Sequence, residues 1–347
     1  MNRYDDVCRR LRQNPRRWLV TGVAGFIGSH LLEALLRLDQ HVVGVDNFAT
    51  GYAANFEDAE ERTRGTRGSF RLIEGDIRDP DLCLLACQEV DFVLHQAALG
   101  SVPRSIVDPM TYHQVNVDGF VNMIVAARDT GVRRFVYASS SAVYGDHPAL
   151  PKVEAAIGEP VSPYGLTKRM DEEYGELFRR VYGVESVGLR YFNVFGRRQD
   201  PQSTYAAVIP QWVANLLRDD PCFIHGDGET TRDFCHVENV VQANVLAAVE
   251  PIGEGNQIYN VGCGDRTSLN LLFSLIRDGL ALRRLELAGV QARYDEFRPG
   301  DVRHSQADIA RIREALGYEP THLLAAGLVE ALGWYFEHLD PQPVAAA

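Results

Sequence analysis

The chain has 347 residues, of which 46% are hydrophobic and 24% are charged, an ordinary composition for a globular protein of about two domains. Its 35 basic and 47 acidic residues give a formal net charge of −12 without a long basic tract, so we expect no nucleic acid partner. No apolar run reaches the roughly 18 residues of a membrane span, and the opening residues lack the apolar core of a secretory signal. The 6 cysteines form no CxxC pair, so we expect them to be reduced, in a cytoplasmic protein that binds no membrane.

Short β-branched runs alternate with helical stretches through the first half of the chain, which is typical of a parallel sheet covered on both faces. The predicted strands cover residues 18–22, 41–46, 70–75, 91–96, 134–140, 186–191 and 258–262. The predicted helices cover residues 26–37, 80–88, 109–130, 164–182, 207–218, 238–249 and 307–316. This order predicts an α/β fold, a Rossmann-type doubly wound parallel sheet with a smaller interleaved C-terminal lobe.

After Tyr191 the regular alternation of strands and helices ends, and loops rich in Gly, Pro and Asn follow. We therefore predict a sheet domain of residues 1–190 plus 237–262, in which residues 1–16 form an extra N-terminal helix. The substrate-binding lobe is predicted to comprise residues 191–236 plus 263–340.

A glycine-rich turn follows the first predicted strand, where Gly22, Gly25 and Gly28 open a helix. Such a turn brings backbone N–H groups to a pyrophosphate at the positive end of the helix. The second strand ends in Asp46, whose carboxylate would bind both ribose hydroxyls and repel a 2′-phosphate, so NAD is favoured over NADP. The predicted cofactor-binding residues are Gly22, Gly25, Phe26, Ile27, Gly28, Asp46, Asn47, Gly51, Asp76, Ile77, Gln96, Tyr164 and Lys168.

Tyr164 and Lys168 lie four residues apart in a predicted helix, so both side chains are on one face. Lys168 is one of two lysines in a chain with 33 arginines, which argues against a chance YxxxK match. Tyrosine hydroxyls are normally protonated at neutral pH, but a neighbouring ammonium and the positive nicotinamide ring of NAD⁺ both favour the phenolate. The pair is therefore predicted to act as a base and its supporting cation, and residues 139–141 at the end of the fifth strand offer a serine hydroxyl relay.

These motifs together resemble the extended short-chain dehydrogenase/reductases, over residues 18–335, and among them the nucleotide-sugar 4-epimerases. The segments that carry the resemblance are TGVAGFIGSHL, VDNF, GDIRD, HQAA, SSSAVYGD, SPYGLTK, LRYFNVFG, GDGETTRDF and RPGDVRHS. Three further segments, LGSVPRS, FGRRQDP and YAAVIP, are similar to the subgroup that acts on UDP-N-acetylglucosamine (UDP-GlcNAc) and UDP-N-acetylgalactosamine (UDP-GalNAc) in bacterial polysaccharide pathways.

The resemblance implies a role for individual residues. The catalytic residues would be Ser140, Tyr164 and Lys168. The substrate-binding residues would be Ser101, Arg104, Ser140, Ser141, Asn193, Gln199, Ala207, Val208, Ile209, Phe223, Arg232, Arg298, Asp301 and Ser305. Within this set Arg232 and Arg298 would clamp the diphosphate, and Asp301 would hold a ribose hydroxyl. Phe223 would stack on the uracil where family members often have a tyrosine, so a hydroxyl contact is lost.

The resemblance also implies the size of the sugar. Ser305 would occupy the place beside the sugar C2 group where epimerases of plain hexoses usually carry a tyrosine, which leaves room for an N-acetyl group. Gly100, Ser141, Gln199 and Ala207 also resemble the acetamido-preferring subgroup. We therefore expect UDP-GlcNAc/UDP-GalNAc interconversion through a 4-keto intermediate, and slower action on UDP-glucose and UDP-galactose, for the synthesis of polysaccharide precursors such as those of lipopolysaccharide.

Other activities remain to be weighed against this one. Nucleotide-sugar 4,6-dehydratases use an Asp-Glu pair where Ser141 and Ala142 stand, and UDP-glucuronate decarboxylases place a glutamate at Ala142, so both are disfavoured. A 4-epimerase of UDP-glucuronate or of a UDP-N-acetylhexosaminuronate would share nearly all the machinery, with Arg104 facing the carboxylate. A non-catalytic NAD-binding regulator is disfavoured because Tyr164 and Lys168 are both present.

The expected partners are a UDP-sugar and a second copy of the chain. Related epimerases are usually homodimers that pair the helices near 109–130 and 164–182 into a four-helix bundle. Val121, Ile124 and Val125 fit such a face, although a face buried within one chain would have the same pattern. No metal ion is expected to take part.

Overall fold

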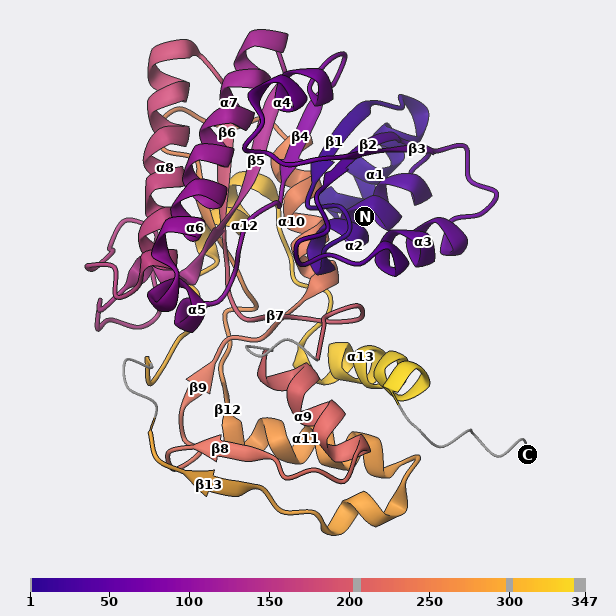
Figure 1. Ribbon diagram of the computed structural model, residues 1–347, viewed down its shortest axis with the longest axis vertical. Coiled ribbons are helices and arrows are strands. Elements are labelled where there is room, and N and C mark those ends of the chain that lie inside the picture. Colours follow the sequence, from indigo (N-terminus) through magenta and orange to yellow (C-terminus); the bar gives the residue numbers. More distant parts are fainter. Residues whose placement is uncertain (1, 202–206, 298–301, 340–347) are drawn as a thin grey trace.

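The computed structural model describes residues 2–201, 207–297 and 302–339. Its centre is a seven-stranded parallel sheet in the order β11-β6-β5-β4-β1-β2-β3 (Figure 1). The strands are β1 (Arg17–Thr21), β2 (His41–Asp46), β3 (Ser69–Glu74), β4 (Phe92–His95), β5 (Arg134–Ser140), β6 (Ser186–Tyr191) and β11 (Ile258–Val261). Every strand predicted for this sheet is present, which confirms the Rossmann-type α/β fold.

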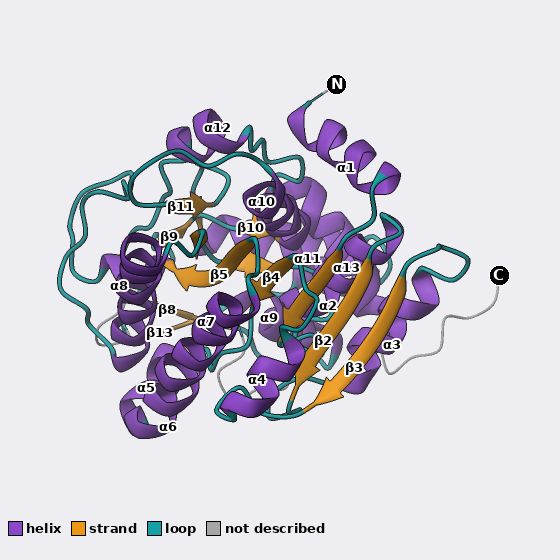
Figure 2. Cartoon of the chain, turned by 90° about the horizontal axis from the view of Figure 1, so that it is seen from above, coloured by secondary structure: helices purple, strands orange, loops and turns teal. Residues whose placement is uncertain are grey.

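Helices cover both faces of the sheet because alternate residues of each strand are apolar on opposite sides. One layer contains α4 (Pro80–Ala86), α7 (Gly119–Thr130) and α8 (Pro163–Tyr182), and the other contains α1 (Arg3–Gln13), α2 (Phe26–Arg37), α3 (Ala53–Arg62), α10 (Val237–Val249) and α12 (Ala310–Leu316) (Figure 2). In β1, Trp18 and Val20 pack with the second layer and Leu19 packs with the first.

A third apolar core lies below the sheet, in the part of the molecule drawn at the bottom of Figure 1. It is built from α9 (Val208–Leu217), α11 (Leu269–Ala281), the 3₁₀ turn η3 (Leu285–Gly289) and α13 (Leu324–Leu339). The short strands around it are β7 (Val194–Phe195), β8 (Phe223–His225), β9 (Thr231–Arg232), β10 (Cys235–His236), β12 (Thr267–Ser268) and β13 (Arg293–Asp295). This core forms a separate lobe. The exact residues at which the two domains were expected to divide stay a prediction.

The predicted helix over residues 109–130 is interrupted by a wider turn. It comprises α6 (Pro109–His113), the π-helical turn η1 (Gln114–Asp118) and α7. The wider turn brings Asn116 inward, where its amide oxygen accepts from Leu99 N at 2.8 Å and its amide nitrogen donates to Leu99 O at 3.1 Å. A π turn at such a place fixes the loop after β4, which borders the site described below.

Several helices differ from the sequence prediction. α3, α5 (Val102–Val107), α11 and α13 were not predicted. The helix expected over 307–316 begins three residues later, because Ala307 forms a β-bridge with Lys152. Among the described residues, no helix combines the length and the apolar character needed to cross a membrane.

Candidate active site

The carboxyl ends of the parallel strands meet at a cavity of about 950 Å³. β1 pairs with β2 on one side and β4 on the other, so the chain reverses direction across the sheet here, where open α/β sheets bind their ligands. All predicted site residues in the described part of the chain line this cavity, with the exception of Ser305. Arg298 and Asp301 lie outside the described residues.

The glycine-rich turn after β1 requires glycine at two positions, because a Cβ there would collide with the surrounding backbone. Gly22 has a φ of +68°, and a Cβ there would lie 2.9 Å from Ala97 N. A Cβ on Gly28 would lie 2.0 Å from Gly22 O. Helix α2 begins after Gly25 with no side-chain cap and no acidic residue in its first turn, so its N–H groups are available to an anion.

Asp46 ends β2 at the edge of this turn and is 8% exposed. Its two carboxylate oxygens accept from Ala24 N at 2.8 Å and from Phe48 N at 2.9 Å. Burial raises the pKa of this carboxyl, and the backbone N–H groups oppose the rise. The side chain is held rigidly beside the dinucleotide turn, as a ribose-binding carboxylate has to be.

The next strand along continues the same wall of the cavity. Asp76 follows β3, and the guanidinium of Arg78 lowers the pKa of its carboxyl to about 2. Asn47 donates to the same carboxylate at 2.8 Å. Asp76 is therefore an anion at neutral pH, and Arg78 and Asn47 hold its carboxylate in the cavity lining.

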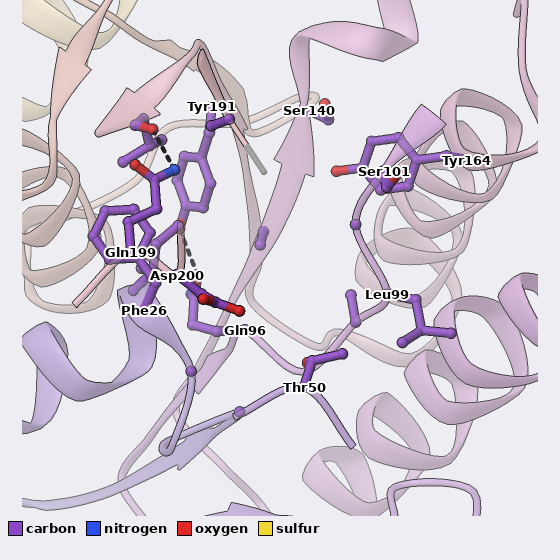
Figure 3. Close-up of a pocket in the computed structure, with 18 of the residues that line it drawn as sticks. Phe26, Thr50, Gln96, Leu99, Ser101, Ser140, Tyr164, Tyr191, Gln199 and Asp200 are labelled. Carbon is purple, nitrogen blue, oxygen red and sulfur yellow. Dashed lines mark hydrogen bonds between the residues drawn. The ribbon is translucent and has the colours of Figure 1, made fainter. Parts of the chain in front are cut away.

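The floor of the cavity carries a fixed polar network. Tyr191 donates to Gln96 Oε1 at 3.0 Å (Figure 3). Asn244 bonds to both side chains, at 2.8 Å to the Tyr191 hydroxyl and at 3.1 Å to Gln96 Nε2. Burial raises the pKa of Tyr191, so this hydroxyl stays neutral. Tyr191 was not among the predicted site residues, although it ends the sixth predicted strand.

Tyr164 is placed by the start of α8. Ser162 caps the helix by accepting from Gly165 N at 3.0 Å, and a Cβ on Gly165 would come within 2.8 Å of Ala142 O. Glycine at 165 thus lets the helix start pack against the 3₁₀ turn η2 (Ser141–Tyr144) that follows β5. Ser140, at the end of β5, accepts from Ala142 N at 3.1 Å, which leaves its O–H able to donate into the cavity.

Lys168 lies one turn after Tyr164 and its side chain is 4% exposed. Its ammonium donates to Asp171 Oδ2 at 3.2 Å. His95, at the end of β4, is buried next to it, and burial, followed by the charge of Lys168, lowers the pKa of its imidazole to about 3. The histidine is therefore neutral, and Thr21 Oγ1 lies 2.8 Å from its Nδ1.

A second buried cluster anchors α8 to the sheet. Arg190 on β6 makes two hydrogen bonds to the Glu172 carboxylate, both at 2.8 Å. Ser139 Oγ donates to Glu172 at 2.5 Å. These bonds tie the helix that carries Tyr164 and Lys168 to the two strands beneath it.

The loop after β4 borders the cavity opposite the floor network. Ser101 has a φ of +88°, a strained value for a residue with a side chain, and it caps α5 by accepting from Arg104 N at 3.3 Å. Tyr112 donates to Gly100 O, and its ring meets the Tyr164 ring edge-on at 6.4 Å. Ser101 and Arg104 line the same cavity as Tyr164, and Ser101 lies beside Tyr164 in Figure 3.

The lobe supplies the remaining wall. Phe223 on β8 is 44% exposed, and its carbonyl accepts from Trp212 Nε1 at 3.2 Å. Arg232 on β9 donates to Arg303 O at 3.3 Å and lines the cavity. Ser305 N donates to Thr231 O at 3.1 Å, so the residue lies next to this wall rather than in it.

Sequence reasoning missed several lining residues. His225 is two residues from Phe223 on β8 and therefore on the same side of the strand, a period-2 signal that was available. Asp200 accepts from Tyr52 at 3.0 Å, a contact across 148 residues that no local pattern reveals. Thr111 and Trp212 also line the cavity.

His236, His322 and Glu330 place three potential metal-ligand atoms within 4.8 Å of one another, outside the cavity lining. The two imidazole rings stack with an interplanar angle of 25°. Glu330 already accepts from Arg197 Nε at 2.8 Å. This arrangement favours an ion-pair cluster over a cation site.

Comparison with known proteins gives a consistent assignment. The NAD dependent epimerase/dehydratase family model matches residues 18–262. The UDP-glucose 4-epimerase of Mycolicibacterium smegmatis is 38% identical over 321 residues, which cover 92% of this chain and 98% of that protein.

Two solved structures share the fold over nearly the whole chain. The UDP-N-acetylglucosamine 4-epimerase of Methanobrevibacter ruminantium, in complex with UDP-N-acetylmuramic acid, has a TM-score of 0.85 and 35% identity over 93% of this chain and 99% of that one. The UDP-glucose 4-epimerase of Thermus thermophilus, in complex with NAD, has a TM-score of 0.79 and 31% identity over 92% and 98%. The glycine-rich turn and the Tyr164–Lys168 pair thus lie in a chain that belongs to the NAD-dependent epimerase/dehydratase family.

Proposed function

We propose that this chain is a UDP-sugar 4-epimerase that interconverts UDP-GlcNAc and UDP-GalNAc and acts more slowly on UDP-glucose and UDP-galactose. One observation carries the proposal: Tyr164, Lys168 and Ser140 line the same cavity as the glycine-rich cradle on one side and Phe223 and Arg232 on the other. A ligand that reaches from the lobe to the cradle passes the tyrosine. The epimerase relatives support the reaction class.

The family is NAD-dependent, and the cofactor supplies a hydride acceptor and donor that is regenerated in each turnover. Gly22, Gly28 and the start of α2 fit its pyrophosphate, and Asp46 fits a ribose. Tyr164, as phenolate, would take the proton of the sugar 4-hydroxyl, while the C4 hydride would pass to bound NAD⁺ and later return from it to the opposite face of the 4-keto sugar. The Tyr164 oxygen would then return the proton.

Lys168 favours the phenolate by its charge, and Ser140 relays a hydrogen bond between the sugar oxygen and Tyr164. The nucleotide has to stay bound while the hexose rotates, so binding energy belongs on the UDP moiety, away from the reacting carbon. Phe223, Arg232 and Asn193 are our candidates for this anchor, together with Arg298 and Asp301, which lie outside the described residues.

The substrate preference rests on the size of side chains near the sugar. Gly100, Ser141 and Ala207 all line the cavity, and small residues there leave volume for an N-acetyl group. Gln199 lines it as well. A related structure of 35% identity is a UDP-N-acetylglucosamine 4-epimerase, which supports this preference.

The experiment is a side-by-side measurement of kcat/KM for UDP-GlcNAc, UDP-glucose and UDP-glucuronate, with products separated by chromatography. We expect the highest value for UDP-GlcNAc. A clear preference for UDP-glucose would overturn the N-acetyl assignment and keep the epimerase. A preference for UDP-glucuronate would assign Arg104, which lines the cavity, to the sugar carboxylate. No conversion of any of the three would overturn the proposal as a whole.

We also propose that the protein is a cytoplasmic homodimer whose product enters polysaccharide synthesis. Leu166, Leu177 and Val181 on the outer side of α8 are 47%, 38% and 57% exposed, which suits pairing with a second copy. Ile124 is fully buried within the chain, whereas Val121 and Val125 are partly exposed, so only part of the face expected on α7 remains open.

A further inference from the structure

Asp171 is a buried carboxylic acid beside the proposed catalytic lysine. It follows Lys168 by three residues on α8, and its side chain is 1% exposed. Oδ2 accepts from the Lys168 ammonium at 3.2 Å, while Oδ1 is buried with no hydrogen-bond partner. A carboxylate with one hydrogen bond and no contact with water is poorly stabilised as an anion.

The surroundings of the pair decide its charge state. Burial raises the pKa of the Asp171 carboxyl to about 7, against the attraction of Lys168, and the neighbouring Glu172 adds to the rise. Other titratable and charged groups face the Lys168–Asp171 pair. They are His95 of β4, Tyr137 of β5, and Arg190 of β6, which is paired with Glu172. The adjacent Tyr164 is faced by Tyr112 of α6, which lies near the charge of Arg104.

These neighbours do not take over the role of Asp171. His95 is neutral, and burial raises the pKa of Tyr137 and of Tyr112, so both phenols keep their protons. Arg190 is matched by Glu172 with two hydrogen bonds. Asp171 is therefore the nearby group whose charge changes with pH around neutrality.

We propose that Asp171 is a positioning residue that shares the Lys168 ammonium with the Tyr164 site, so that its own protonation sets how strongly the ammonium favours the phenolate. This inference rests on the proposed roles of Tyr164 and Lys168. When Asp171 is protonated, the ammonium acts on the tyrosine with its full charge. When Asp171 ionises as the pH rises, the carboxylate holds the ammonium and offsets its charge, which weakens the support for the phenolate.

The test is the pH dependence of kcat for Asp171→Asn in the NAD-loaded protein. The amide keeps the shape and an oxygen for Lys168 but never becomes negative. Above neutral pH, where Asp171 of the wild type is ionised, we expect the variant to reach a given kcat at a pH about one unit lower. At more acid pH, where Asp171 is protonated, we expect the two profiles to coincide, with the KM for the UDP-sugar unchanged throughout. The tyrosinate absorbance of the NAD-loaded variant should appear at correspondingly lower pH than in the wild type, and this signal should vanish when Tyr164 is also changed to Phe.

Glu173→Gln is the matched control. It removes one negative charge from the same helix two residues away, at a side chain that is 69% exposed and pairs with Arg169 at 3.2 Å. We expect its pH profile to match that of the wild type. If Asp171→Asn does not fold, Asp171→Ala is measured in the same way and should show the same shift with a lower kcat, because the ammonium loses its anchor.

The outcomes separate this inference from the proposed function. If the wild type is active, Tyr164→Phe is inactive and the Asp171→Asn profile overlays that of the wild type, the inference is wrong and the epimerase stands. If Asp171→Asn loses activity evenly at every pH, the residue is merely structural. If the wild type converts no UDP-sugar, the proposed function fails first.

Discussion

Asp46 in the cavity lining and Asp171 beside the lining residue Lys168 are two buried carboxyls, and their partners differ. Asp46 accepts two backbone N–H groups, which oppose the rise of its carboxyl pKa caused by burial and hold it where we propose that a ribose binds. Asp171 has a single partner and an unpaired oxygen, which makes its charge sensitive to pH. Two residues of one type thus take different roles because the number of fixed hydrogen bonds differs.

Asp46→Ala should sharply reduce the NAD that the purified protein retains. Hydrogen bonds to a charged group contribute about 1.5–3 kcal/mol, which corresponds to roughly a tenfold to hundredfold weaker affinity. The nucleotide released on denaturation is the readout. Glu74→Ala is the control, because Glu74 stands beside Asp46 in the sheet register but is exposed and does not line the cavity. Unchanged NAD content in Asp46→Ala would refute the assignment.

At the scale of elements, α8 connects the sheet to the chemistry. Its first two turns carry Tyr164 and Lys168, and its middle is fixed by Glu172 to Arg190 and Ser139. The helix cannot shift without separating a buried ion pair. The placement of the tyrosine therefore depends on the Arg190–Glu172 ion pair, which is not part of the cavity lining.

Glu172→Gln should lower the free energy of unfolding by about 3–5 kcal/mol, because it leaves Arg190 as a buried charge without its counter-ion. Urea denaturation measures the change. The neighbouring Glu173→Gln removes only an exposed pair and should cost at most about 0.5 kcal/mol. Equal effects of the two substitutions would show that the buried pair does not anchor the helix.

The elements that the sequence predicted are those with a local signal. The seven strands have β-branched runs, and the turn of Gly22 and the Tyr164–Lys168 spacing are short-range patterns. α13 also carries a helical period, with Leu328, Leu332 and Tyr335 buried, and was overlooked. α3 buries only Ala59 and offers no apolar period, so its helix follows from packing on α2. The strained Ser101 and the long-range contact between Tyr52 and Asp200 have no short-range signal.

At the scale of the molecule, two arginines join the lobe segment after β7 to the sheet domain. Arg198 pairs with Glu33 of α2 and with Asp58 of α3. Arg197 also reaches Glu33, at 3.7 Å, and pairs with Glu330 of α13 in the lobe. Helix α2, whose start we propose to bind the dinucleotide, is therefore linked directly to the lobe that lines the other side of the cavity. These ion pairs hold the sheet-domain side of the cavity and its lobe side in a fixed relative position.

The proposed dimer can be tested on the outer side of α8. Leu177→Glu combined with Val181→Glu should convert the protein to a monomer, because both side chains would be buried against a second copy. Sedimentation velocity measures the mass, and circular dichroism checks the fold. Val329→Glu, at a 76% exposed position of α13, is the control and should remain a dimer. A wild-type protein that sediments as a monomer would contradict the proposal.

The most direct test of the whole account is the turnover of Tyr164→Phe in the NAD-loaded protein, measured with UDP-GlcNAc and with UDP-glucose. The substitution removes one oxygen and leaves the ring that packs against Tyr112. We expect kcat to fall by about 10²–10⁴-fold on both sugars, with NAD content and melting temperature unchanged. A variant that keeps nearly the full wild-type rate would contradict the claim that the Tyr164 phenolate is the base.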